Sequence, residues 1–309
     1  MKSSDVIAIV VNWKLKEDTE RCIESLERLD HPCQIILVDN GSEDGSAEYL
    51  AQRFPHLQII ALPVNVGFGA AVNCAIRHVL SQPDWNYVFL LNNDATIHPH
   101  AITELLSITQ KNPDVGIFGP KVYYNHPADQ LWYAGARRRR GVLAAADTGR
   151  GQKDASRFDI LREVDYVFGA AMLIRRQVFE RIGLFDERFF LYLEDWDFCL
   201  RAQQGGFRLF YVPQSHVHHK GSASTVQYRS LRKYHYARST ILFLKKHTSL
   251  LFLLPNIIFW SFVFAKTASQ DIFQGDLKIL GTYLSGLFHG LFAAFHKPSP
   301  SDEQITLSR

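Results

Sequence analysis

Two short runs of apolar, mostly β-branched residues, with a helical pattern between them, constrain the fold most. Residues 6–11 read VIAIVV, and residues 35–38 read IILV. Such runs are typical of strands buried on both faces, as in a parallel sheet. Between them, apolar residues recur at helical spacing from Cys22 to Leu29, and Pro32 ends the helix. Strand, helix and strand predict a doubly wound α/β domain.

The same alternation continues along the chain. Residues 57–62, 88–91 and 115–118 predict three more strands, and residues 101–110 predict a helix. Residues 164–174 resume a strand pattern that glycine and alanine interrupt. With 309 residues, 47% of them hydrophobic and 21% charged, the chain has a globular composition and can bury one large core or two modest ones.

The pattern weakens over residues 123–162, which include four consecutive arginines at residues 137–140. Glycines and alanines follow these arginines, and we expect a mobile loop here. Such a charge run is usually a solvated face. The alternative is a flap over an anionic donor or a lipid phosphate.

The charge of the chain is small but unevenly distributed. A formal net charge of +3 is too low to indicate nucleic-acid binding. No Asp or Glu lies between Phe198 and Gln270, although Arg and Lys recur there, so we expect this region to face a diphosphate or a lipid surface. The four cysteines show neither zinc nor disulfide spacing and are interpreted as reduced core residues of a cytosolic chain. The N-terminal apolar run is too short for a signal peptide.

Polar residues follow the predicted strands at their carboxyl ends, where open α/β sheets bind ligands. Asp39 follows the second strand, and its carboxylate can accept the N3 hydrogen of a uracil or thymine ring, or a ribose hydroxyl. Alternatively, it caps the helix that begins near Asp44. Gly67 and Gly69 follow the third strand and would let a ligand approach the backbone, although many turns contain such a pair.

The fourth strand ends in Asn92, Asn93 and Asp94. A polar and acidic cluster at the end of a buried strand suits a hard divalent cation that also holds a diphosphate. One carboxylate is few for a metal, so phosphate oxygens and water would have to complete its shell. The alternative is an Asx turn before Pro99.

Residues 165–224 contain the densest group of acidic and imidazole side chains. Glu194, Asp195 and Asp197 open a short predicted helix that ends at Gly205. Neighbouring acids repel one another and an apolar wall desolvates them, so at least one can have a raised pKa and act as a general base. The helix N-terminus favours the anion instead. Alternatively, Glu194 and Asp197 only cap the helix.

The C-terminal part is first basic and then strongly apolar. Residues 228–247 predict a helix with a basic face. Residues 250–265 and 279–295 are apolar, but each run is shorter than the roughly 20 residues of a comfortable membrane span. We expect in-plane or re-entrant helices at the cytosolic leaflet. Two short spans forming a hairpin, or a helical extension packed on the domain or a second subunit, are the alternatives.

Taken together, these features resemble the family 2 glycosyltransferases of the GT-A fold, and most closely their bacterial rhamnosyltransferase-like members. The resemblance covers about residues 6–247 and depends on ordered motifs: VVNW, VDNGSEDGS, NVGFGAAVN, LLNNDATI, FGAAMLIRR, GLFDERFFLYLEDWDFCLRAQQGGFRLFYVP and HHKGSAS. We therefore expect a GT-A catalytic domain over residues 1–247. Residues 248–309 would form a helical extension associated with the membrane.

The resemblance also implies which residues bind the donor. Asp39 would recognise the nucleotide base. Asn65, Gly67 and Asn73 would shape the donor pocket, and Asn93 would contribute to donor binding.

A metal site is implied at the end of the fourth strand. Asp94 stands where the family's acidic DXD motif coordinates Mg²⁺ or Mn²⁺ on the donor diphosphate, and Asn92 replaces the first acid of that motif. His219 matches the family histidine that completes the metal site. His216 and His218 are further candidate ligands.

The implied reaction is a single inverting displacement in which Asp195 takes the proton of the acceptor hydroxyl. Arg201 and Lys220 either add positive charge near the leaving phosphates or are solvated surface groups. The resemblance favours dTDP-rhamnose as donor, with UDP-sugars next, and a lipid-linked or cell-envelope glycan as acceptor. The enzyme would act at the cytoplasmic face of the inner membrane, peripheral or shallowly inserted.

Two other classes of function are weighed against this interpretation. A nucleotidyltransferase usually has a glycine-rich phosphate loop after the first strand, and residues 12–14 contain no glycine. A non-catalytic, sugar-nucleotide-binding membrane scaffold is motivated by Asn92. The joint presence of Asp94, Asp195 and His219 opposes the scaffold.

Overall fold

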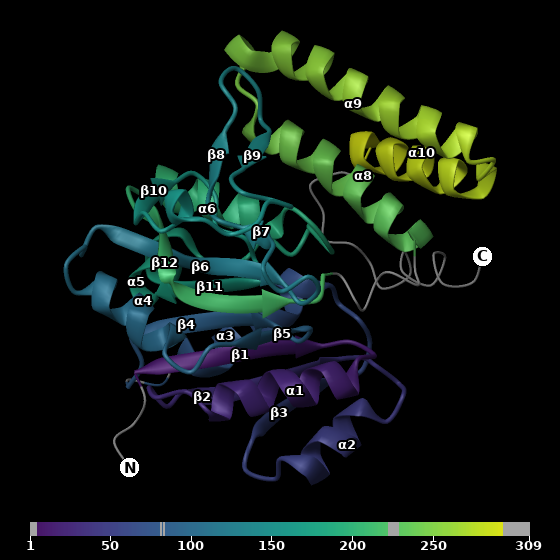
Figure 1. Cartoon of the computed structure of the whole chain (residues 1–309). Helices are drawn as coiled ribbons and strands as arrows, with labels where there is room; N and C mark the ends of the chain where they lie inside the picture. Colours follow the sequence, from purple (N-terminus) through teal and green to yellow (C-terminus); the bar gives the residue numbers. More distant parts are fainter. Residues whose placement is uncertain (1–4, 81, 83, 222–228, 293–309) are drawn as a thin grey trace.

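The computed structural model describes residues 5–292, except residues 81, 83 and 222–228. One large sheet with helices around it forms the main body, and three further helices form a separate group at the top of the view in Figure 1. The strands are β1 (Val6–Asn12), β2 (Gln34–Asn40), β3 (Gln58–Leu62), β4 (Tyr87–Asn92), β5 (Ala95–Ile97), β6 (Val115–Tyr124), β7 (Leu131–Tyr133), β8 (Ala136–Arg138), β9 (Ala145–Asp147), β10 (Arg162–Val164), β11 (Ala171–Arg175) and β12 (Arg208–His219).

A helix follows each of the first three strands, as the sequence pattern predicts, and helices also follow several later strands. They are α1 (Lys16–Glu27), α2 (Ser46–Arg53), α3 (Phe68–Leu80), α4 (Ala101–Thr109), α5 (Arg176–Ile182), α6 (Glu194–Gln204), α8 (Arg229–His247), α9 (Leu253–Phe273) and α10 (Leu277–Phe292). Two short 3₁₀ turns, Ser156–Phe158 and Leu250–Phe252, complete the regular structure of the described residues.

The main sheet has the order β10-β12-β6-β11-β4-β1-β2-β3, with β5 added to β12 and β7 to β6. The long neighbours β3, β2, β1 and β4 are parallel, as are β6 and β12. The short strands β5, β7, β10 and β11 pair antiparallel. The predicted α/β fold with a mostly parallel sheet is therefore confirmed.

The register of the central strands decides where their polar ends lie. Every residue of β1 is buried, because helices cover both faces of the sheet. Asn12 at the end of β1 lies opposite Asp39 of β2, and Val11 lies opposite Asn92 of β4. Three segments far apart in the sequence thus place their polar ends at one edge of the sheet.

The prediction of a mobile loop at residues 137–140 is wrong in part. Arg137 and Arg138 belong to β8, which forms an antiparallel hairpin with β9. The N–H of Arg139 donates to the carbonyl of Ala144 and continues the hairpin. Backbone hydrogen bonds order this segment although its side chains are charged and exposed, so composition alone indicated a loop.

The predicted length of the first apolar C-terminal segment is also wrong. α9 has 21 residues, and together with the preceding 3₁₀ turn it is long and apolar enough to cross a membrane. Pro255 lies in the first turn of α9, where its missing N–H costs no hydrogen bond. Polar residues from Lys266 to Gln270 continue the helix beyond the apolar run. α10, with 16 residues, stays below the length of a span.

Candidate active site

The carboxyl ends of β1 and β4 open into a cleft of about 240 Å³ between the sheet and α8. Its other walls come from the turn before α3, the segment before β11 and the segment that leads into α6. Among the residues predicted for the site, those lining the cleft are Asn65, Gly67, Asn93, Asp94, Asp195 and His219. Asp39 and Asn73 lie outside its lining, so the structure brings together six of the eight predicted residues.

Asp39 is 4% exposed and hydrogen-bonded on both oxygens. The side-chain amide of Asn12 donates to Oδ1 at 2.6 Å, and the N–H of Ser42 donates to Oδ2 at 3.1 Å. The hydroxyl of Ser42 also donates to Oδ1 at 2.6 Å. The next residue, Asn40, lines the cleft. Asp39 is thus fixed beside the cleft, and its contact with a nucleotide base remains a prediction.

Gly67 shapes the wall next to Asn40. Its φ of +87° is left-handed, and a Cβ atom here would lie 2.4 Å from the carbonyl oxygen of Phe190. The side-chain oxygen of Asn65 accepts hydrogen bonds from the N–H of Gly67 at 2.9 Å and from the amide of Asn40 at 3.0 Å. Only glycine fits this turn without moving the segment that leads to α6.

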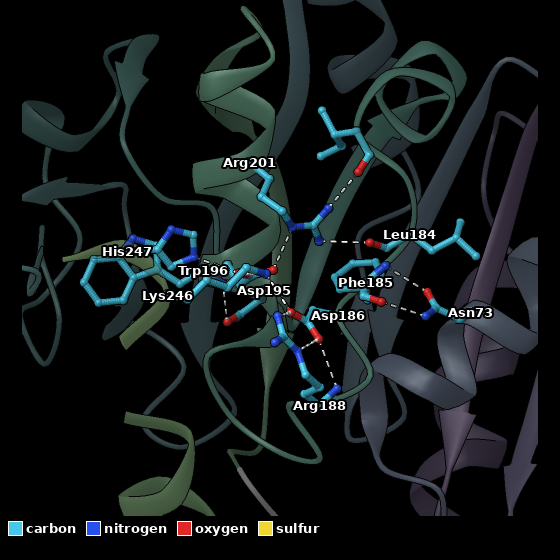
Figure 2. Close-up of polar contacts among 12 residues, drawn as sticks. Asn73, Leu184, Phe185, Asp186, Arg188, Asp195, Trp196, Arg201, Lys246 and His247 are labelled. Atoms are coloured by element: carbon cyan, nitrogen blue, oxygen red, sulfur yellow. Dashed lines mark hydrogen bonds and ion pairs between the residues drawn. The ribbon is translucent and has the colours of Figure 1, made fainter. Parts of the chain in front are cut away.

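Asn73 of α3 acts away from the cleft. Its amide donates to the carbonyl of Phe185 at 2.9 Å, and its carbonyl oxygen accepts the N–H of Phe185 at 3.0 Å (Figure 2). The amide also donates to Glu187 at 3.0 Å. Asn73 therefore joins α3 to the segment before α6, and its part in a donor pocket stays a prediction.

Asp94 and His219 meet in the cleft because β12 pairs with β5. His219 lies opposite Ala95, the neighbour of Asp94. The Nε2 atom of His219 lies 3.0 Å from Oδ1 of Asp94, and both side chains are almost fully buried. The amide nitrogen of Asn92 lies 3.3 Å from the same imidazole nitrogen. The ring of Phe168 packs edge-on against the imidazole. A buried carboxylate and a buried imidazole thus lie side by side in the lining of the cleft.

This pair fits a divalent cation only when a substrate adds ligands. Within the described part of the chain, no group of three or more His, Cys, Asp or Glu side chains is arranged to hold a metal. The Nδ1 atom of His219 is buried and has no hydrogen-bond partner among the described residues. Carboxylate and imidazole are both ligands for Mg²⁺ or Mn²⁺. Diphosphate oxygens and water would have to complete the shell.

The other two candidate histidines lie elsewhere. Successive side chains of a strand point to opposite faces, and His218 stacks on Tyr123 instead of lining the cleft. The Nε2 atom of His216 lies 3.0 Å from the carbonyl oxygen of Pro213. Neither His216 nor His218 is near enough to the cleft to line it.

Asp195 lies in the first turn of α6 and accepts three hydrogen bonds. The hydroxyl of Tyr166 and the N–H of Gly169 donate to Oδ2 at 2.6 and 2.8 Å, and the N–H of Trp196 donates to Oδ1 at 2.7 Å. Burial raises the pKa of Asp195, although these hydrogen bonds favour its anion. A carboxylate with a raised pKa that faces a cleft is suited to accept a proton.

Glu194 precedes Asp195 and is buried in the same wall. Its Oε2 atom has no hydrogen-bond partner among the described residues. Burial, together with the charge of Asp195, holds the pKa of Glu194 well above its usual range. Neither Glu194 nor Asp197 makes a side-chain cap, so the helix-capping alternative does not account for them. Asp195 accepts three hydrogen bonds that stabilise its anion, so it is more easily ionised than Glu194.

The far side of α6 is tied to α8 by ion pairs. Asp197 has no exposed surface and is bonded to Arg201 at 2.8 Å, to Lys246 at 2.6 Å and to His247 at 2.8 Å. Burial would raise the pKa of Asp197, but the hydrogen bond from His247 and the two positive charges lower it. Arg201 also donates to two backbone carbonyls, at Ile182 and Leu184 (Figure 2). Arg201 therefore holds α6 in place and does not line the cleft.

Lys220 likewise has a structural partner. Its ammonium lies 3.0 Å from Asp18 and is half exposed, and its N–H donates to the carbonyl of Asp94 at 2.9 Å. The sequence interpretation missed Tyr166 and Gly169, which hold Asp195. Their position at the start of the acidic and aromatic segment was the one available signal.

The chain is similar to one protein family and to several known proteins. The family model described as Glycosyl transferase family 2 matches residues 5–183. The chain is 31% identical over 264 residues to the N-acetylglucosaminyl-diphospho-decaprenol L-rhamnosyltransferase of Mycobacterium tuberculosis, covering 78% of this chain and 84% of the relative. It is 27% identical to the rhamnosyltransferase WbbL of Escherichia coli, covering 69% and 83%.

Two solved structures share the fold. GalNAc-T7 with UDP, GalNAc and Mn²⁺ is similar with a TM-score of 0.54 and 13% identity, covering 76% of this chain and 51% of that one. The mannosyltransferase PcManGT from Pyrobaculum calidifontis, in complex with GDP-Man and Mn²⁺, has a TM-score of 0.53 and 13% identity, covering 94% and 88%. At this identity the likeness shows the GT-A fold alone.

Proposed function

The chain belongs to glycosyl transferase family 2 and is a glycosyltransferase, and from this premise we propose that it transfers rhamnose from dTDP-rhamnose to a hydroxyl of a lipid-linked glycan, with inversion. The single observation that carries the proposal is the shared cleft. A buried, hydrogen-bonded Asp195 and the buried pair of Asp94 and His219 line the same 240 Å³ space. A proton acceptor and a site for a diphosphate are the two parts that a one-step displacement needs.

Asp195 is the proposed general base. One carboxylate oxygen of Asp195 accepts the proton of the acceptor hydroxyl while the hydroxyl oxygen forms a bond to the anomeric carbon of the donor. The bond between the anomeric carbon and the diphosphate breaks with its electron pair on the phosphate oxygen, and the nucleoside diphosphate leaves. A single attack from the opposite face inverts the anomeric configuration, and one base is sufficient for it.

Asp94 and His219 would hold a divalent cation together with the donor diphosphate, and such a cation would neutralise the charge that develops on the leaving group. Asn93 precedes Asp94 and bonds to two residues of neighbouring elements. Its amide donates to Thr19 at 3.0 Å and to Asn12 at 3.3 Å, which fixes the strand end that carries Asp94.

The names of the relatives support the choice of donor and acceptor. The Mycobacterium tuberculosis relative is named for rhamnosyl transfer to a diphospho-decaprenol-linked sugar. A further relative from Shigella flexneri, 22% identical over 83% of this chain and 86% of its own length, is named a dTDP-rhamnosyl transferase. A lipid-linked acceptor also agrees with α9, which is apolar enough to enter a membrane.

We propose a catalytic domain at residues 1–247 and a membrane-associated extension at residues 248–309. The part of the extension after residue 292 lies outside the described residues. The protein would work at the cytoplasmic face of the inner membrane, where the extension lies on or shallowly within the lipid. Exposed apolar side chains on α9, such as Leu254 and Phe262, support this placement.

A donor panel tests the proposal. The full chain in detergent is incubated with dTDP-rhamnose, UDP-glucose, UDP-N-acetylglucosamine and GDP-mannose, with and without Mg²⁺ or Mn²⁺, and release of nucleoside diphosphate is measured with a polyprenyl-diphosphate-linked sugar as acceptor. Acceptor-dependent release that is largest for dTDP-rhamnose supports the proposal. Donor binding without release in every combination would favour the non-catalytic scaffold, and preference for a UDP-sugar would replace the donor.

A further inference from the structure

A second cavity, of about 540 Å³, lies outside the cleft between the hairpin β8–β9 and the start of α9. Its walls are the hairpin turn, the end of α8 and the first turn of α9. Figure 1 shows the hairpin β8–β9 rising from the main body toward one end of α9. Three arginines line it: Arg138, Arg139 and Arg140. Nothing in the proposed reaction uses this cavity, so its cluster of cations needs another explanation.

The three arginines have no ion-pair partner in the part of the chain that the structure describes. All three are exposed, and none forms an ion pair with another described residue. Asp165 is the one carboxylate in the described lining, and the N–H of Arg138 donates to its Oδ2 atom at 2.8 Å. A planar guanidinium group can donate two hydrogen bonds to two oxygens of one phosphate. Several such groups around one cavity therefore suit a diphosphate better than an anion with a single charge.

The arginine turn is held in place by α9. The N–H of Leu143 donates to the side-chain oxygen of Asn256 at 2.7 Å, and the indole N–H of Trp260 donates to the carbonyl of Leu143 at 3.1 Å. Asn256 and Trp260 are both buried, at 3% and 7% exposure. These two hydrogen bonds anchor the hairpin turn to α9. The position of the three guanidinium groups therefore depends on the position of α9.

An apolar surface begins at the rim of this cavity. Phe252 lines it and is half exposed, and the adjoining Leu250, Leu251 and Leu254 are 90%, 80% and 66% exposed. A cation cluster next to exposed aliphatic side chains matches a molecule with an anionic head and a hydrocarbon tail. An inorganic anion would use the arginines but would leave this surface uncovered.

Two contacts connect the cavity to the catalytic cleft. Asp165 lines the cavity, and its neighbour Tyr166 donates to Asp195. His247 lines the cavity, and its Nε2 atom lies 2.8 Å from Asp197 of the helix that carries Asp195. The two spaces therefore lie on either side of the first turn of α6.

We propose that this cavity binds the diphosphate of a polyisoprenoid-linked acceptor, with Arg139 and Arg140 on the phosphate oxygens and the first turns of α9 against the lipid chain. The inference depends on the proposed function, because it places the acceptor of that reaction. It assigns the acceptor head group to the hairpin, away from Asp94 and His219. It also explains why an arginine run is built onto an apolar helix.

The test uses farnesyl diphosphate, a soluble isoprenoid diphosphate, as the probe for the full chain in detergent, with binding measured by calorimetry. The variant is Arg139→Ala/Arg140→Ala. The matched control is Arg137→Ala, because Arg137 is an exposed arginine of the same hairpin that does not line the cavity. Loss of charged hydrogen bonds predicts at least about tenfold weaker binding in the double variant and unchanged binding in the control.

Inorganic pyrophosphate and phosphatidylglycerol vesicles separate the possible sources of the phosphate. If pyrophosphate binds as tightly as farnesyl diphosphate, the lipid assignment is overturned. The assignment is also overturned if the double variant loses vesicle binding as much as it loses farnesyl diphosphate binding. Wild-type affinity in the double variant would overturn the site.

dTDP binding, measured on the same samples, reports whether the variants are folded. It also separates the two proposals. Intact farnesyl diphosphate binding together with failure of every sugar nucleotide would contradict the proposed function and leave this site standing.

Discussion

At the scale of single residues, the protonation of Asp195 is set by opposing effects. Burial raises the pKa of its carboxyl group, and the hydrogen bonds from Tyr166 and Gly169 lower it. If Asp195 is the base, as proposed, it must be deprotonated to act, so we expect activity to rise as the pH increases through this pKa. Residues that change the pKa of Asp195 should therefore move the acidic limb of the pH profile.

Tyr166→Phe tests this balance. Removing the hydroxyl deletes one hydrogen bond to the Asp195 anion, which raises the pKa of the base. The acidic limb of the profile of kcat/KM against pH should move to higher pH, and activity should recover at alkaline pH. Tyr133→Phe is the matched control, because that buried hydroxyl donates to the carbonyl of Tyr166 and not to a carboxylate. A profile in Tyr166→Phe with the wild-type midpoint would show that this hydroxyl does not tune the base.

The sequence predicted the location of some site residues correctly and of others incorrectly. Asp94 and Asp195 stand next to recognisable strand or helix ends, and the structure places both in the cleft. Asn73 and Arg201 were predicted from their place in motifs, but each bonds to backbone carbonyls outside the cleft. A motif predicts that a residue lies near the site in the sequence. It does not predict where the side chain points, because that depends on packing against a distant segment.

At the scale of elements, the turn before α3 is coupled to the segment that leads into α6. The two meet where Gly67 approaches the carbonyl of Phe190, and the N–H of Phe68 donates to that carbonyl at 2.9 Å. Two walls of the cleft therefore depend on one close backbone contact.

Gly67→Ala should disrupt this contact. The methyl group would meet the Phe190 carbonyl at 2.4 Å, in addition to the strain of a left-handed φ. Gly45→Ala is the matched control, because Gly45 has a φ of +78° but no atom within 4 Å of the added Cβ. We expect a loss in the free energy of unfolding of about 1 kcal/mol for Gly45→Ala and about 3 kcal/mol or more for Gly67→Ala, measured in urea. Equal losses would show that the contact with Phe190 is not tight.

The strands of the first half of the sheet could be predicted because each is a buried apolar run between helices. β12 could not be predicted in full, since its residues after Pro213 are all polar except Val217 and end in histidines that were interpreted as ligands. Its pairing with β5 brings His219 to Asp94, and pairing between distant strands leaves no local pattern in the sequence.

At the scale of the whole molecule, the helical extension carries most of the exposed large apolar side chains of the described residues. They lie on α9, α10 and the turn before α9, and that turn adjoins the arginine-lined cavity. Length and hydropathy allowed this region to be predicted as membrane-associated. The hydrogen bonds between Leu143 and α9 could not be predicted from the sequence, because they are made by backbone groups of a hairpin that lies far away in the chain.

Leu254→Glu/Ile258→Glu tests the lipid-facing role of α9. Leu254 and Ile258 are 66% and 62% exposed and lie one turn apart, so two carboxylates there oppose insertion without disturbing the core. The fraction that co-sediments with phosphatidylglycerol vesicles should fall well below that of the wild type. Ile160→Glu, at a site 59% exposed on the catalytic domain, should sediment as the wild type does. Equal sedimentation of all three proteins would argue against the membrane face.

The central claim is that Asp195 takes the proton of the acceptor hydroxyl as this hydroxyl attacks a donor held at Asp94 and His219. The most direct measurement is to determine turnover and dTDP-rhamnose binding on the same preparations of the wild type and Asp195→Asn. Asparagine keeps the size of the side chain but cannot take the proton, so we expect turnover to fall about 10²- to 10⁴-fold while the donor dissociation constant stays unchanged. Wild-type turnover in Asp195→Asn, or loss of donor binding in step with turnover, would contradict the account.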